Sequence, residues 1–258
     1  MSVKLLLSII LFILMFFIGG SRGIKSFFTL YLNFIILFVI IILIAYNFDP
    51  IIVSLVGCLI ISVVMLFFIN GVNQKTITAF ISVIITLLIL LLIIYKVGDT
   101  FKVQGFSDEE FDAISPYNLY IHTNFIKVTI SVILLGLIGA VVDASISISS
   151  AMNEILLHNP NIKQKELFLS GINIGKDIIG TTTNTLYFAY IGGFIALLIW
   201  FNELNYSLVK IINSKVFVDE IIQILFSGIG AIMIIPITAY VSSKYYLKIR
   251  TIKGGIYD

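Results

Sequence analysis

Residues 132–154 read VILLGLIGAVVDASISISSAMNE. Most of this stretch is apolar, and about 20 apolar residues are what an α-helix needs to cross a bilayer. Asp143 stands inside it, although a carboxylate at bilayer depth costs at least about 2.5 kcal/mol. Such a residue is kept where an ion, a proton, a counter-charge or a partner helix needs it. The alternative is a packing role, in which Asp143 hydrogen-bonds a neighbouring helix.

The composition of the whole chain agrees with a membrane protein. Of its 258 residues, 59% are hydrophobic and only 12% are charged, and the mean hydropathy is +1.11. These values exclude an ordinary soluble domain and a disordered chain. The net charge of +2 is too small to predict nucleic-acid binding. Cys58 is the single cysteine, and no His or Cys pattern typical of zinc occurs, so we expect neither a metal site nor a cofactor.

The apolar residues form blocks separated by turn residues. Backbone at bilayer depth must be helical to satisfy its hydrogen bonds. The sequence therefore predicts an all-α, polytopic integral membrane helix bundle, a single domain over residues 1–258 with about seven transmembrane helices. The first block could be a short span or a half-inserted helix, so six or seven spans stay open. The blocks are Lys4–Gly19, Phe27–Tyr46, Ile51–Ile69, Ile77–Tyr95, Phe125–Ser147, Ile178–Phe201 and Val218–Tyr240.

The distribution of Lys and Arg predicts the orientation. With seven spans, ten of these residues fall on one side of the membrane and six on the other. Because the side richer in Lys and Arg is normally cytoplasmic, the C-terminus is predicted to be cytoplasmic. The loop that follows Tyr95 is then external.

Two of the blocks carry polar faces. Asp143, Ser147 and Glu154 lie at spacings of 0, 4 and 11 residues, together with Ser150 at 7, which places them on one side of a helix. The next block repeats the same spacing with Asn173, Asp177, Gly180 and Asn184. Two such faces predict a polar seam through the membrane.

The seam is the candidate functional site. Carboxylate, amide and hydroxyl oxygens suit protons or hard cations rather than soft metals. The alternative is a polar packing interface whose groups satisfy one another. Lys176 could reach a carboxylate of the other helix. The candidate proton or ion relay comprises Asp143, Ser147, Glu154, Asn173, Lys176, Asp177, Thr181 and Asn184.

Small residues and a connector complete the prediction for this region. Glycine permits close approach of helices in membranes. We expect helix contacts at Gly136, Gly139, Gly175, Gly180, Gly192 and Gly193. Between the two polar helices, a cytoplasmic connector is predicted at about residues 155–177. Its sequence IKQKELFLSGINIGKD predicts an amphipathic helix at the membrane surface that leads straight into the next span. The alternative is a plain connector.

Two motifs resemble a known family. GLIGAVVDASISISSAMNE (136–154) and SGINIGKDIIGTTTNTLYFAYIGG (170–193) resemble the signature of the YibE/F family of bacterial multi-span membrane proteins. The polar helix pair over residues 136–193 carries this resemblance. The chain is similar to the shorter, YibF-like members, since it has no large domain between its spans. The resemblance implies a bacterial inner-membrane location and pairing with a YibE-like protein.

A second, more distant resemblance concerns layout. An acidic residue in one span, a terminal Glu, a helical excursion and a polar span resemble half of an RND-type permease. Asp143 would match the proton-relay position of that family, and Glu154 its terminal Glu. This chain departs from the pattern because it has no Arg before Glu154 and no large extracellular domain. The resemblance implies a proton-coupled helix pair.

Two functions follow as expectations. The first is a permease or transporter subunit coupled to a proton or cation through the acidic helix pair, with an unknown substrate. The second is a non-transporting scaffold that assembles with a YibE-like protein. We do not expect an enzyme, because Asp143 has no accompanying G-x-G-D motif and no Ser stands in G-x-S-x-G. The expected partners are the lipid bilayer and either a YibE-like protein or further copies of the chain.

Overall fold

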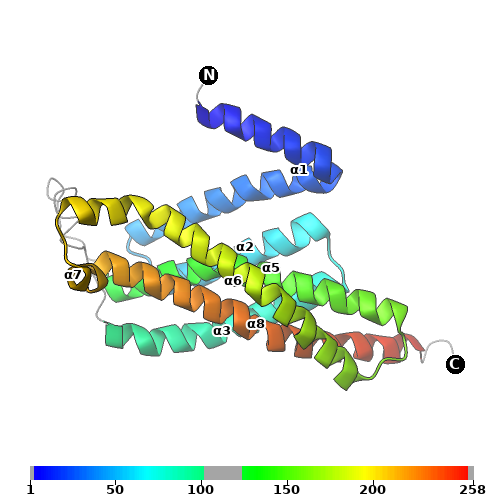
Figure 1. The fold of residues 1–258 in the computed structure, drawn as a ribbon. Coiled ribbons are helices and arrows are strands. Elements are labelled where there is room, and N and C mark those ends of the chain that lie inside the picture. Colours follow the sequence, from blue (N-terminus) through cyan, green and yellow to red (C-terminus); the bar gives the residue numbers. More distant parts are fainter. Residues whose placement is uncertain (1–2, 102–123, 255–258) are drawn as a thin grey trace.

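The computed structural model describes residues 3–101 and 124–254, and over these residues it consists of helices and their connections (Figure 1). Among the described residues, five helices are long and apolar enough to cross a membrane. The two parts of α6, which meet at a bend of 41° between Gly193 and Ile195, make a sixth if they are one span. The prediction of an all-α membrane helix bundle is confirmed. The helices are α1 (Val3–Ala45), α2 (Pro50–Val63) continued by the π-helical η1 (Val64–Phe68), α3 (Gln74–Phe101), α5 (Phe125–His158), α6 (Gln164–Glu203), α7 (Leu208–Ile212) and α8 (Lys215–Gly254).

The first two predicted blocks are joined in α1. Gly20 has a non-helical backbone (φ 54°, ψ −132°), and the chain reverses direction there (Figure 1). The rings of Phe12 and Phe27, one from each arm, lie 4.9 Å apart. A Cβ on Gly23 would lie 1.8 Å from the carbonyl oxygen of Met15, so only glycine fits at this approach. The first arm is about 25 Å long at 1.5 Å per residue, and whether it crosses the membrane stays a prediction.

α5 lies at the centre of the bundle. It packs against α2, α3, α6 and α8, and α6 also packs along α8. Fully buried apolar side chains of α5, such as Leu137, Val141 and Ile148, supply the middle of the core. The helix therefore holds its polar residues in a fixed place relative to four neighbours.

The helix ends gather at two opposite ends of the bundle. The loop between α5 and α6 lies near the C-terminus, at what we call the C-terminal end, and α7 lies at the other, the α7 end (Figure 1). At the C-terminal end, Lys75 pairs with Glu154 at 2.7 Å. At the α7 end, Lys127 pairs with Asp49. Charged pairs at both ends and apolar helix between them are typical of a bundle that crosses a bilayer.

The predicted connector at about residues 155–177 is much shorter in the structure. α5 continues to His158 and α6 begins at Gln164, so only residues 159–163 are non-helical. The N–H of Lys163 donates to Glu166 Oε2 at 3.4 Å at the start of α6, and no proline follows until α8. The segment predicted to be a helix leading straight into the next span forms the first turns of α6. Its place at the membrane surface stays a prediction.

The ion pair at the α7 end gives a pH prediction. Asp49 accepts from the N–H groups of Ile51 and Ile52 and so caps α2. Its hydrogen bond with Lys127 holds the pKa of the Asp49 carboxyl below its ordinary 3.8. A carboxyl whose pKa is lower in the folded than in the unfolded protein stabilises the folded state at pH values above its unfolded pKa. This stabilisation is lost as the pH falls through the folded pKa.

Asp49→Asn should therefore keep the helix cap but lose the ion pair. Both side chains are partly exposed, so the loss near neutral pH should be at most about 1 kcal/mol. Melting of the detergent-solubilised protein between pH 3 and pH 6 measures it: the wild type should lose more stability on acidification than Asp49→Asn. Equal losses in the two proteins would contradict a stabilising pair.

Candidate functional site

Asp143 lies near the middle of α5. About 27 Å of helix separates it from Phe125 and about 22 Å from His158, at 1.5 Å per residue. Its side chain is on an exposed side of the helix, as is that of Ser147 one turn further on. Among the residues that the structure describes, nothing hydrogen-bonds the Asp143 carboxylate or pairs with it. Within one chain, Asp143 therefore forms no hydrogen bond to a described residue that would support a packing role.

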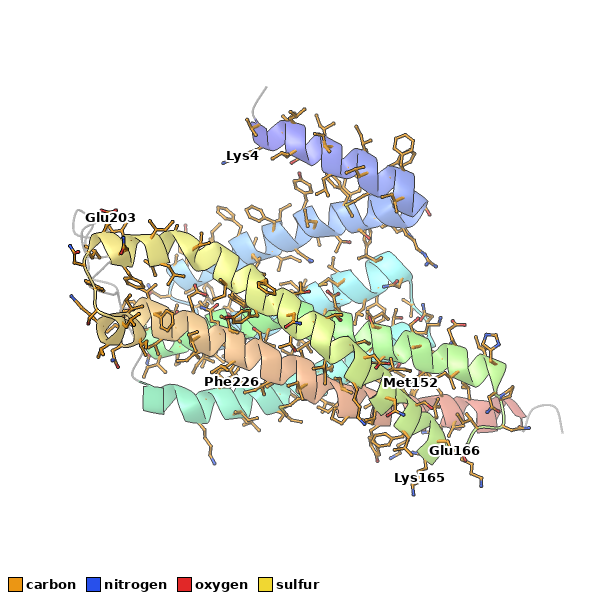
Figure 2. The ribbon with its side chains drawn as sticks, viewed as in Figure 1. Lys4, Met152, Lys165, Glu166, Glu203 and Phe226 are labelled. Carbon is orange, nitrogen blue, oxygen red and sulfur yellow. The ribbon has the colours of Figure 1, made fainter. Side chains whose placement is uncertain are left out.

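Two contacts fix how α6 lies along α5. A Cβ on Gly136 would lie 2.8 Å from the hydroxyl of Tyr190, and a Cβ on Gly171 would lie 2.6 Å from the sulfur of Met152. Met152 is on α5 near the place where α6 passes over it (Figure 2). Because the helices run in opposite directions, the residues of α6 level with Asp143 fall at about 180–183.

The same contacts show which side chains face one another. Asp143 follows Gly136 by seven residues, which is two turns, so it lies on the same side of α5. Thr183 precedes Tyr190 by seven residues and lies on the same side of α6. Both lie two turns from the Gly136–Tyr190 contact in the same direction. Asp143 and Thr183 are therefore level, on sides that face the other helix.

At this level there is open space beside two glycines. No atom lies within 4 Å of where a Cβ on Gly139 or on Gly180 would be. The hydroxyl oxygen of Thr183 is buried and has no hydrogen-bond partner in the described part of the chain. We call Asp143, Thr183 and the open space at Gly139 and Gly180 the mid-helix site. It combines a carboxylate of α5 and a hydroxyl of α6, neither of which has a hydrogen-bond partner among the described residues.

Three more predicted residues come near this level. Lys176 and Asp177 fall level with Ser147, and Thr181 lies beside the mid-helix site. All three have exposed side chains, and the hydroxyl of Thr181 donates to the carbonyl of Ile178 at 3.0 Å. Lys176 forms no ion pair with a described carboxylate. The structure thus brings these residues together along the helices without bonding them to one another.

The remaining predicted residues are two asparagines of α6 and Glu154 of α5. Asn173 and Asn184 are exposed on α6 on either side of this group. Glu154 is in the last turns of α5, and its carboxylate pairs with Lys75 of α3. The prediction that Glu154 shares the seam with Asp143 therefore does not describe this structure, because Lys75 occupies its carboxylate at the C-terminal end.

The glycines predicted at helix contacts fall into two groups. Gly136 meets Tyr190, and a Cβ on Gly175 would lie 2.1 Å from Cγ2 of Ile235 in α8. By contrast, a Cβ added at Gly139, Gly180, Gly192 or Gly193 would have no atom within 4 Å. Among the described residues of a single chain, these four glycines are therefore not contact points.

Two polar groups at the helix interfaces were not predicted. At the α7 end of the site, the hydroxyl of Tyr190 lies 3.3 Å from that of Ser227, and Gln223 Nε2 donates to Asp219 Oδ2 at 3.5 Å. This stretch of α8 includes Phe226 (Figure 2). The spacing of Asp219, Gln223 and Ser227 by four residues was the available signal, since it puts all three near one side of α8.

The second group closes the C-terminal end of the bundle. Thr78 of α3, Ser149 of α5 and Tyr246 of α8 join their hydroxyls at 2.6 to 3.2 Å. All three residues are at most 1% exposed. Buried hydroxyls that satisfy one another in this way hold helices together. Isolated Ser and Thr residues are so common in membrane helices that nothing in the sequence singles these out.

Comparison with known proteins gives one match. A family model described as YibE/F-like protein matches residues 7–248. No curated protein and no solved structure matches the chain. The matched region contains all the residues of the mid-helix site and both polar groups on α8.

Proposed function

The chain belongs to the YibE/F-like family, and we propose that it is a permease subunit that moves a proton or a small cation through the mid-helix site. The observation that carries the proposal is the unpaired carboxylate of Asp143, level with the unpaired, buried hydroxyl of Thr183. A carboxylate at this depth is costly and needs a partner. Since none is supplied by the described part of the chain, an ion or a proton is the simplest partner.

The donor atoms favour a hard ion. Asp143 supplies a carboxylate, and Ser147, Thr181 and Thr183 supply hydroxyls at nearby levels. Oxygen ligands of this kind bind protons, Na⁺-like ions or Mg²⁺-like ions in preference to soft metals. Lys176 and Asp177, level with Ser147, add one charge of each sign on the C-terminal side of the site. The net negative charge of Asp143 then remains to be balanced by the transported cation.

The proposed location is the bacterial inner membrane, with the C-terminus in the cytoplasm. The excess of Lys and Arg at the C-terminal end supports this orientation. In a Cys58→Ser background, Gln164→Cys should be protected from an impermeant thiol reagent on intact cells. Asp108→Cys, in the loop outside the described residues, should be labelled. Labelling at Gln164 but not at Asp108 would reverse the orientation.

A partner is the second part of the proposal, and it also fits the alternative of a non-transporting scaffold. The polar side chains of Asn173, Asp177, Thr181 and Asn184 are exposed on α6. In a bilayer, polar groups exposed to lipid are unfavourable, so a neighbouring helix should cover them. A YibE-like protein or a second copy of this chain would supply that helix.

Purification and reconstitution separate these possibilities. We expect the chain to co-purify with a YibE-like protein or as a dimer, and Asn184→Leu to weaken that association. A monodisperse monomer with full activity would contradict the need for a partner. An ion-gradient-driven flux in liposomes containing the complex would favour the permease, whereas an assembled complex without flux would favour the scaffold.

A further inference from the structure

On the basis of the proposed role of Asp143, we infer that α8 supplies a polar path from the α7 end to the mid-helix site, with Tyr190 at its narrowest point. The path would carry the proton or cation along Asp219, Gln223 and Ser227. It implies that the site is reached from the α7 end and is closed toward the C-terminal end.

The path begins close to the start of α8. Asp219 lies about 6 Å along the helix from Lys215, and Ser227 lies about 18 Å along it, at 1.5 Å per residue. Gln223 stands between them and donates to Asp219 at 3.5 Å. These three residues lie near one side of α8. Gln223 and Ser227 adjoin apolar positions such as Ile222 and Phe226, whereas Glu220 stands next to Asp219.

The path then reaches α5 and α6 at one place. The carboxamide oxygen of Gln223 is 3.8 Å and the hydroxyl of Tyr190 is 2.8 Å from where a Cβ on Gly136 would lie. Tyr190 also reaches Ser227 at 3.3 Å. Because Gly136 has no side chain, Tyr190 of α6 and Gln223 of α8 can both approach α5 at this position. From this point Asp143 and Thr183 are each two turns away, on the sides already facing one another.

The opposite direction is blocked by packing. Toward the C-terminal end, Met152 and Ala239 both pack closely against Gly171, and both are fully buried. The buried hydroxyls of Thr78, Ser149 and Tyr246 satisfy one another. Close-packed interiors leave few voids as large as a water molecule. Water and ions should therefore reach Asp143 from the α7 end and not from the C-terminal end.

Cysteine accessibility tests this difference without any transport assay. In a Cys58→Ser, Asp143→Cys chain, a small cationic water-soluble thiol reagent is applied to either side of sealed membrane vesicles. We expect labelling from the side of the α7 end. Gly136→Leu, and separately Gln223→Leu, should slow it at least about tenfold, since close packing would leave no room for the reagent. Tyr190→Ala should speed it.

The control is Gly192→Leu, which lies on α6 in open space and should leave the rate unchanged. If Gly136→Leu does not fold, Gln223→Leu and Tyr190→Ala still decide the outcome. Equal labelling from both sides, labelling from the C-terminal side alone, or rates that none of the three path variants changes would overturn the inference. A functional Asp143→Asn chain would refute the ion role but would leave the labelling pattern unchanged, so the two failures can be told apart.

Discussion

Asp143→Asn is expected to produce a folded, membrane-inserted protein that no longer functions. Asparagine keeps the size of the side chain and can still hydrogen-bond, but it carries no charge and cannot take up a proton. A packing role would tolerate this change, whereas a proton or cation role would not. The measurement is complementation of a strain that lacks the chain, with expression and melting temperature checked in the same samples.

Glu154→Gln is the matched control for this substitution. It makes the same carboxyl-to-amide change on the same helix, but at a residue that pairs with Lys75 and is 54% exposed. Partly exposed ion pairs contribute about 1 kcal/mol or less, so Glu154→Gln should fold and complement. Loss of function in both variants would mean that α5 needs both carboxylates, and full function in both would leave Asp143 structural.

Gly175→Leu is expected to prevent stable folding. A Cβ alone would lie 2.1 Å from Cγ2 of Ile235, so a leucine would push α6 away from α8. Overpacking a close contact costs about 1–3 kcal/mol for extra methylene groups and more where the backbone must move. That is a large part of a typical total stability of about 5–15 kcal/mol. Gel filtration and thermal melting in detergent should show aggregation or a strongly lowered melting temperature.

Gly180→Leu is the control on the same helix, because no atom lies within 4 Å of its Cβ position. It should melt close to the wild type as an isolated chain. The smaller change Gly175→Ala allows a graded test: it should destabilise, and Ile235→Ala in the same chain should recover part of the loss by removing Cγ2. If Gly175 and Gly180 variants behave alike, the α6–α8 contact is wrong.

The sequence was sufficient for the helices and for their polar faces. Apolar blocks of span length predict helices because a helix satisfies its backbone hydrogen bonds within one segment, where lipid offers no partners. The four-residue and seven-residue spacings place Asp143 with Ser147, and Asp177 with Asn184, on single faces. Both predictions depend only on the sequence of a single helix.

The sequence was not sufficient for the way the helices pack. Periodicity does not say which helix meets a given face, and apolar side chains pack equally well against lipid or protein. The pairing of Glu154 with Lys75 crosses 79 positions of the chain and had no local signal. The contact of Gly136 with Tyr190, which sets the level of Thr183 against Asp143, likewise had no local signal in the sequence. The bounds of the connector were not predicted, because an amphipathic pattern is shared by a surface helix and by the first turns of a spanning one.

Ion flux tests the proposed role of Asp143 most directly. The protein, together with any partner that co-purifies, is reconstituted into liposomes that contain a pH-sensitive dye, and a proton or cation gradient is imposed. We predict gradient-driven flux with the wild type and with Glu154→Gln, and only the background of protein-free liposomes with Asp143→Asn. Flux through Asp143→Asn at the wild-type rate would contradict the proposed ion pathway.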